Sequence, residues 1–144
     1  MVAQKEHDIA RPKNKIRVLV VDDHVIVRNV IRLVLDKHTD EFSVGGEAGD
    51  GEAAVQMAVS EEWDIVLLDI SLPKKNGIMA LEEIKAAKPG LPVIMYSSHP
   101  ESEHAEMAIS KGAACYIEKG KANRLLEAMR RVLALQPPTG QLRS

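Results

Sequence analysis

The sequence predicts a doubly wound α/β fold, in which helices cover both faces of a parallel sheet. Two observations support this prediction. Five short apolar runs alternate along the chain with five longer segments of helical periodicity. The runs are rich in valine, isoleucine and leucine, as in strands that are covered on both faces. Because each connection is long enough to contain a helix, neighbouring strands can run parallel with right-handed crossovers.

The first three predicted strands cover residues 16–21, 42–48 and 64–68, and the third stops at Asp69. A helix is expected within residues 24–38, where apolar residues recur at three- and four-residue spacings. Its apolar face should contain Ile26, Val27, Val30, Ile31, Val34 and Leu35. The next helix follows a glycine turn, and its apolar face should contain Ala54, Val55, Ala58 and Val59.

The second half continues the same alternation. Proline, asparagine and glycine mark a loop at residues 71–77, and Pro89 and Gly90 end the helix that follows it. The remaining elements are a helix at 78–88, a strand at 91–98, a helix at 100–113, a strand at 115–120 and a helix at 121–136. The periodicity also predicts that four methionines face the core: Met79, Met95, Met107 and Met129.

The pattern divides the 144 residues into three parts. Residues 1–15 are polar and lack periodicity, so a disordered or loosely ordered lead-in is expected. Residues 16–135 should form one domain, which is long enough to bury a sizeable core. Residues 136–144 contain proline, glycine and serine, and they are expected to form a linker stub or a flexible tail.

The composition argues against several classes of function. A net charge of −2 and a pI near 6.2 do not favour a nucleic-acid-binding surface. Aromatic residues make up only 3% of the chain, so stacking platforms for bases or sugars are not expected. No run approaches the ~20 apolar residues that a membrane-spanning helix needs. A single cysteine, Cys115, forbids an intramolecular disulfide, and a soluble cytoplasmic protein is expected.

Polar side chains follow the predicted strands at their carboxyl ends, where ligands gather in a doubly wound sheet. Asp22 and Asp23 follow the first strand, Asp69 the third, Ser97 closes the fourth and Lys119 the fifth. Three carboxylates that meet need a counter-charge, and oxygen ligands favour a hard cation such as Mg²⁺. With an ammonium group and a hydroxyl beside them, these residues suit phosphoryl transfer to a carboxylate.

Four stretches carry a family resemblance: "VLVVDDH" (18–24), "DIVLLDISLPKKNG" (64–77), "VIMYSS" (93–98) and "GAACYIEKG" (112–120). In this order they resemble the receiver domain of two-component response regulators, a CheY-like domain. The pattern is closest to the branch with C-terminal helix-turn-helix output domains of the LuxR/NarL/FixJ type. The resemblance implies a flavodoxin-like (βα)5 sandwich with strand order 2-1-3-4-5.

The resemblance also implies a role for each matched residue. Asp69 would be the phosphoacceptor. Mg²⁺, or Mn²⁺ in its place, would be held by Asp22, Asp23, Asp69 and the backbone carbonyl of Ser71. Lys119 would pair with the phosphoryl group, Ser97 would be the switch hydroxyl, and Tyr116 would rotate with it. Ser71 and His99 occupy positions that tune the lifetime of the phosphoryl group in this family. Gly120 stands where the family often has proline.

These roles imply a signalling domain that catalyses only its own phosphorylation and dephosphorylation, not an enzyme. The expected partner is a sensor histidine kinase or a phosphotransfer protein, with phosphorylation-dependent homodimerisation as a family-based expectation. Transcriptional control would act through an output domain or partner outside this chain. The nine residues after Leu135 are too few for a helix-turn-helix, so this chain alone is not expected to bind DNA specifically.

Three alternatives remain at this point. A Mg²⁺-dependent phosphohydrolase with an aspartyl-phosphate intermediate typically has a second aspartate two residues after the nucleophile, where this chain has Ser71. A flavodoxin-like cofactor binder would need donors after the first strand, where this chain has carboxylates. A stand-alone receiver could act by protein contact without phosphorylation. His24, His99 and His104 look too scattered for a metal site, although His24 lies close enough to modulate the acidic pair.

Overall fold

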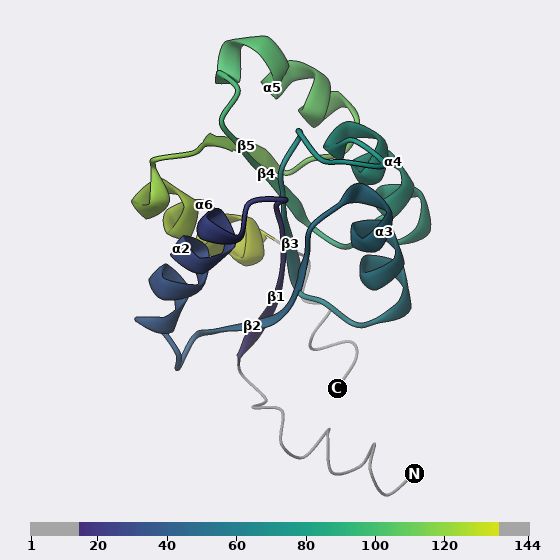
Figure 1. Ribbon diagram of the computed structural model, residues 1–144. Coiled ribbons are helices and arrows are strands. Elements are labelled where there is room, and N and C mark those ends of the chain that lie inside the picture. The colour runs from purple at the N-terminus through teal and green to yellow at the C-terminus, as the bar shows by residue number, and fades with distance from the viewer. Residues whose placement is uncertain (1–14, 136–144) are drawn as a thin grey trace, which may run out of the picture.

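The computed structural model describes residues 15–135, and Figure 1 shows how its strands and helices are arranged. The strands are β1 (Ile16–Val21), β2 (Phe42–Ala48), β3 (Ile65–Leu68), β4 (Val93–Ser97) and β5 (Cys115–Glu118). The helices are α2 (Val25–Asp36), α3 (Gly51–Ser60), α4 (Gly77–Ala87), α5 (Glu101–Ser110) and α6 (Ala122–Leu135). The predicted alternation of strands and helices is therefore confirmed.

The five strands form one parallel sheet with the order β2-β1-β3-β4-β5. Helices α2 and α6 pack on one face, and α3 and α4 cover the other, as Figure 1 shows on the left and right of the sheet. Helix α5 joins the face of α3 and α4 through Ala108. The predicted doubly wound fold and its strand order are both correct.

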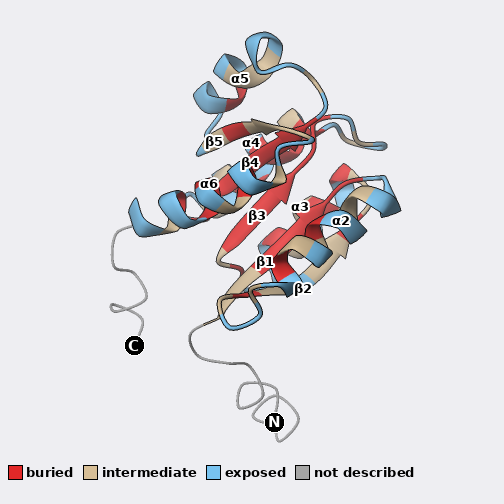
Figure 2. Cartoon of the chain, turned by 90° about the vertical axis from the view of Figure 1, so that its left-hand side faces the viewer, coloured by how far each residue is buried: buried red, intermediate tan, exposed pale blue. Residues whose placement is uncertain are grey.

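The core consists of two apolar clusters, one on each face of the sheet. Strand β3 contributes to both, because successive side chains of a strand point to opposite faces. Val66 and Leu68 belong to the cluster under α3 and α4, while Ile65 and Leu67 belong to the cluster under α2 and α6. Figure 2 shows β3 buried along its length. A run covered on both faces explains why this strand lacks polar alternation.

Five predicted core positions are wrong. Ile26 is 76% exposed, and Val30, Val59, Met79 and Met107 are also exposed. A helix that packs on a sheet buries only the side chains that contact the sheet. Apolar residues at three- and four-residue spacings cover a wider part of the helix surface, so some of them stay exposed. In α2, for example, only Ile31 and Leu35 are buried. Met95 and Met129 are fully buried, as predicted.

Two further expectations concern the ends of the chain and the membrane. The predicted lead-in and tail fall almost entirely outside the described residues, which leave out 1–14 and 136–144. Within residues 15–135, no helix is long and apolar enough to cross a membrane.

Candidate functional site

The register of the sheet brings two aspartates together at the carboxyl ends of β1 and β3. Val21 pairs with Leu68, so Asp22 and Asp69 follow neighbouring strands at the same level. The N–H of Asp69 donates to the carbonyl of Val21 at 3.1 Å, and the N–H of Asp22 donates to Ala48 at 3.0 Å. Both residues are buried: Asp22 is 1% exposed and Asp69 is 2% exposed. Two carboxylates that are removed from water need partners.

Lys119 supplies the partner for both carboxylates. Its Nζ lies 2.6 Å from Oδ2 of Asp22 and 3.1 Å from Oδ2 of Asp69. The backbone N–H of Lys119 donates to the carbonyl of Ser97 at 2.7 Å, which holds the lysine at the end of β5. The ammonium group thus bridges the ends of β1 and β3 from a third strand.

The loop after Asp69 is held by the start of α4. The N–H of Gly77 donates to the carbonyl of Ile70 at 2.7 Å, and Oδ1 of Asp69 accepts from the N–H of Ile70 at 2.8 Å. A Cβ on Gly77 would lie 1.9 Å from the backbone oxygen of Asp69, so only glycine permits this approach. The helix start therefore fixes the backbone of Asp69 and Ile70, from which the carboxylate extends.

The electrostatics of this pocket shift two protonation equilibria. Burial raises the pKa of Asp69, and the nearby charge of Asp22 raises it further, against the opposing effect of Lys119. Burial alone would lower the pKa of Lys119, but its bonds to Asp22 and Asp69 outweigh this effect and raise the pKa. The lysine is therefore held in its charged form, while the negative charge on Asp69 remains unfavourable.

The pocket fits a divalent cation. Ligand atoms of Asp22, Asp23, His24 and Asp69 all lie within 4.8 Å of one another. Three carboxylates face one ammonium group here, which leaves surplus negative charge. Among the described residues, the buried Oδ2 of Asp22 has no partner besides the Lys119 ammonium group 2.6 Å away. Oxygen ligands with unbalanced negative charge suit Mg²⁺.

His24 lies beside the acidic pair, as the sequence predicts. Its N–H donates to Oδ1 of Asp22 at 2.9 Å. Its Nδ1 lies 3.1 Å from Oδ1 of Asp22 and 3.0 Å from Oδ1 of Asp23. The imidazole is largely exposed, so little protein surrounds it beyond its contacts with the two carboxylates.

A second network surrounds His99, the second residue after β4. Its N–H donates to Oγ of the fully buried Ser97 at 3.1 Å. Its carbonyl accepts from the hydroxyl of Tyr116 at 2.9 Å. Tyr116 is itself buried, and this burial raises the pKa of its phenol. The two residues with predicted switch roles thus meet at the backbone of one loop residue.

Ser71 links this network to the loop that follows Asp69. Its Oγ lies 2.7 Å from Nε2 of His99. The structure therefore brings Asp22, Asp23, Asp69 and Lys119 into one pocket and places Ser71, Ser97, His99 and Tyr116 in an adjoining network. The role predicted for the Ser71 carbonyl stays a prediction, as do the other assigned roles.

The sequence-based view that the histidines are scattered is wrong for His99 and His104. Their rings meet edge to face, with centroids 4.8 Å apart and an interplanar angle of 81°. Glu103 completes a group whose ligand atoms lie within 4.8 Å of one another. No sequence pattern predicts this contact, because it depends on the conformation of the loop that leads through Pro100 into α5.

The family described as "Response regulator receiver domain" matches residues 18–130. The chain belongs to this family. The expected resemblance is therefore confirmed, and receiver domains are signalling modules of two-component systems.

Relatives of this receiver domain include regulators of transcription. It is 34% identical over 119 residues to the uncharacterized transcriptional regulatory protein YxjL of Bacillus subtilis, covering 82% of this chain and 54% of the relative. The chain thus spans about half the length of this regulator.

Solved structures of other response regulators share the fold. A two-component response regulator of the LuxR family from Aurantimonas is 29% identical, with a TM-score of 0.78 and coverage of 88% of this chain and 94% of that one. The CheX–CheY–BeF3–Mg complex from Borrelia burgdorferi contains a chain that is 31% identical. That match has a TM-score of 0.73 and covers 88% of this chain and 92% of the other. LuxR-type regulators are thus among the similar proteins, as expected.

Proposed function

We propose that this receiver domain is a phosphorylation-dependent switch in which Asp69 accepts a phosphoryl group. The donor would be the phosphohistidine of a sensor histidine kinase or of a phosphotransfer protein. One observation carries the proposal: Lys119 contacts both Asp22 and Asp69 at the ends of neighbouring strands, in a buried pocket with surplus negative charge. This is where a phosphoryl group on Asp69 would meet both an ammonium group and a cation site.

The residues support in-line transfer to a carboxylate. A carboxylate oxygen of Asp69 would attack phosphorus while the bond to the donor's histidine nitrogen breaks, and that nitrogen would keep the electron pair. Lys119 would neutralise charge on the transferred group. Bound Mg²⁺, or Mn²⁺, would neutralise further charge there, held by Asp22, Asp23, Asp69 and the carbonyl of Ser71. Hydrolysis, in which the phosphoryl group passes to water, would restore the carboxylate.

The second network supports the role of a readout. The Ser97 hydroxyl would give up the hydrogen bond that it accepts from the His99 N–H and would donate one to a phosphoryl oxygen instead. This exchange would draw the β4–α5 loop toward Asp69 and change the surroundings of Tyr116, whose hydroxyl bonds the same loop. The surface formed by α5, β5 and α6 would then change its partners.

The contact between Ser71 and His99 supports a role in the lifetime of the phosphoryl group. Ser71 lies two residues after Asp69, and its Oγ is 2.7 Å from Nε2 of His99. The pair would sit beside a phosphoryl group on Asp69 and would limit or guide the approach of water.

The relatives suggest how the switch would be read. Similarity to transcriptional regulators and to a LuxR-family structure supports control of transcription through an output domain outside this chain. We further propose a cytoplasmic receiver domain at residues 16–135, with a homodimer formed on phosphorylation. A solution mass that stays monomeric with a phosphoryl mimic would refute the dimer.

The proposal is tested by intact mass after incubation with acetyl phosphate and Mg²⁺. The wild type and the control Asp36→Asn, at the exposed far end of α2, should gain one phosphoryl group of about 80 Da that hydroxylamine removes. Asp69→Asn should gain none. Equal labelling of Asp69→Asn would refute Asp69 as acceptor, and sustained release of phosphate over many turnovers would favour the phosphohydrolase alternative.

A further inference from the structure

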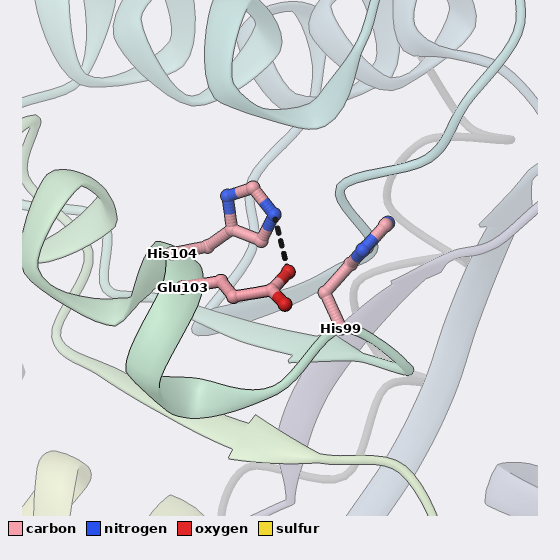
Figure 3. Close-up of side chains that lie close together, drawn as sticks. All are labelled: His99, Glu103 and His104. Carbon is pink, nitrogen blue, oxygen red and sulfur yellow. Dashed lines mark ion pairs between the residues drawn. The ribbon is translucent and has the colours of Figure 1, made fainter.

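A second group of ligand-type side chains lies outside the acidic pocket, at the start of α5. His99, Glu103 and His104 place one ligand atom each within 4.8 Å of the others. Figure 3 shows Glu103 and His104 on α5 and His99 on the loop before it, with the Glu103 carboxylate between the two rings in this view. Nε2 of His104 lies 3.7 Å from Oε1 of Glu103.

The ligand types differ from those of the acidic pocket. Two imidazoles and one carboxylate suit divalent transition metals such as Zn²⁺, whereas Mg²⁺ prefers oxygen ligands alone. At metal–ligand distances of about 2.0–2.1 Å, tetrahedral ligand atoms lie roughly 3.4 Å apart. The separation of Glu103 and His104 is already close to this value. A small rotation of the exposed Glu103 side chain would close the distance to His104. The His99 ring, which lies within 4.8 Å of both, would have to move toward them as well, and water would complete the shell.

One ring nitrogen of His99 already has a partner. Its Nε2 is engaged with Oγ of Ser71 at 2.7 Å, so Nδ1 is the nitrogen that we assign to the metal. Metal-binding histidines commonly use their second ring nitrogen in this way, which fixes the ring. The edge-to-face contact with His104 holds the two rings together without burying either one fully.

We propose that His99, Glu103 and His104 form a binding site for a divalent transition metal cation of the Zn²⁺ type, separate from the acidic pocket. The site joins the loop before α5 to the helix itself. A bound cation would therefore hold the β4–α5 loop in the arrangement seen here, where the His99 backbone bonds both Ser97 and Tyr116.

This arrangement gives the metal a regulatory consequence, which rests on the proposed function. Phosphorylation would need Ser97 to leave the His99 N–H, and a cation on His99 would oppose that movement. Because coupling between two sites is reciprocal, the metal would disfavour the phosphorylated state and phosphorylation would weaken metal binding.

Titration of the full chain with Zn²⁺ tests the site, with excess Mg²⁺ present to occupy the acidic pocket. We expect one Zn²⁺ per chain in the wild type, with at least tenfold weaker binding in both His104→Gln and Glu103→Gln. The control His38→Gln, which changes a histidine beside Arg130, should bind as the wild type does. NMR should show ring shifts at His99 and His104. Unchanged affinity in His104→Gln, or shifts confined to His24, would overturn the proposal.

The regulatory consequence is tested with acetyl phosphate and Mg²⁺. Zn²⁺ should lower the amount of phosphoryl adduct in the wild type but not in His104→Gln. An equal effect of Zn²⁺ on both proteins would refute the coupling through His104. Absence of adduct without Zn²⁺ would instead show that the proposed function fails, and the titration would still decide the metal site.

Discussion

The acidic pocket and the β4–α5 loop around His99 lie side by side but are built differently. In the pocket, Asp22 and Asp69 are almost fully buried and are held by the ends of adjacent strands. In the loop, His99 is only half-buried, and single hydrogen bonds connect it to Ser71, Ser97 and Tyr116. A rigid site favours chemistry at a fixed position, whereas a loop held by few bonds can change its arrangement at low cost.

The largest effect expected in the pocket comes from Lys119→Met. Removal of the ammonium group leaves two buried carboxylates without their shared partner, so the free energy of unfolding should fall by about 3 kcal/mol at neutral pH. Chemical denaturation measures this change. Lys111→Met is the matched control, because its ion pair with Glu82 is largely exposed and should contribute at most about 0.5 kcal/mol. Equal effects of both substitutions would show that the pocket is not the rigid region.

Gly77→Ala should have the next largest effect. The added Cβ would meet the backbone oxygen of Asp69, so either α4 or the loop after Asp69 must shift. We expect a loss of about 2–3 kcal/mol in denaturation, together with slower labelling by acetyl phosphate. Gly90→Ala is the control, since no atom lies within 4 Å of its added Cβ. If both variants behave like the wild type, α4 does not fix the position of Asp69.

The raised pKa of Asp69 predicts a smaller, pH-dependent effect. The folded state binds a proton at Asp69 more readily than the unfolded chain, whose ordinary pKa is near 3.8. The ionised group therefore costs stability above its folded pKa, and this cost disappears as the pH falls to the unfolded value. Asp69→Asn should be more stable than the wild type at neutral pH, with the difference shrinking on acidification. A difference in the free energy of unfolding that stays constant as the pH falls from neutral would contradict the raised pKa of Asp69.

The smallest effect is expected from Tyr116→Phe on β5, which removes a bond to the loop around His99. The ring stays buried while the bond to the His99 carbonyl is lost, so the free energy of unfolding should fall by only about 1 kcal/mol. Hydrogen exchange should report faster opening at His99 and no change at Asp22. Faster exchange in both regions would show that the β4–α5 loop and the acidic pocket open together, so they would not differ in rigidity.

The same contrast explains what the sequence could predict. Asp22, Asp69 and Lys119 were predictable as neighbours because the carboxyl ends of parallel strands meet at one edge of a sheet. The contact between His99 and His104 was not, because it depends on the loop conformation before α5. Periodicity also overestimated the buried face of the helices at Ile26 and Met79, since it does not show how much of a helix surface the sheet covers.

The central claim is that Ser97 connects the chemistry at Asp69 to the loop around His99. NMR with beryllofluoride and Mg²⁺ as a phosphoryl mimic tests it most directly. In the wild type, we expect the mimic to shift the His99 amide and the Tyr116 ring, and in Ser97→Ala we expect shifts only near Asp69. A wild-type response confined to the surroundings of Asp69, with His99 and Tyr116 unchanged, would contradict the claim.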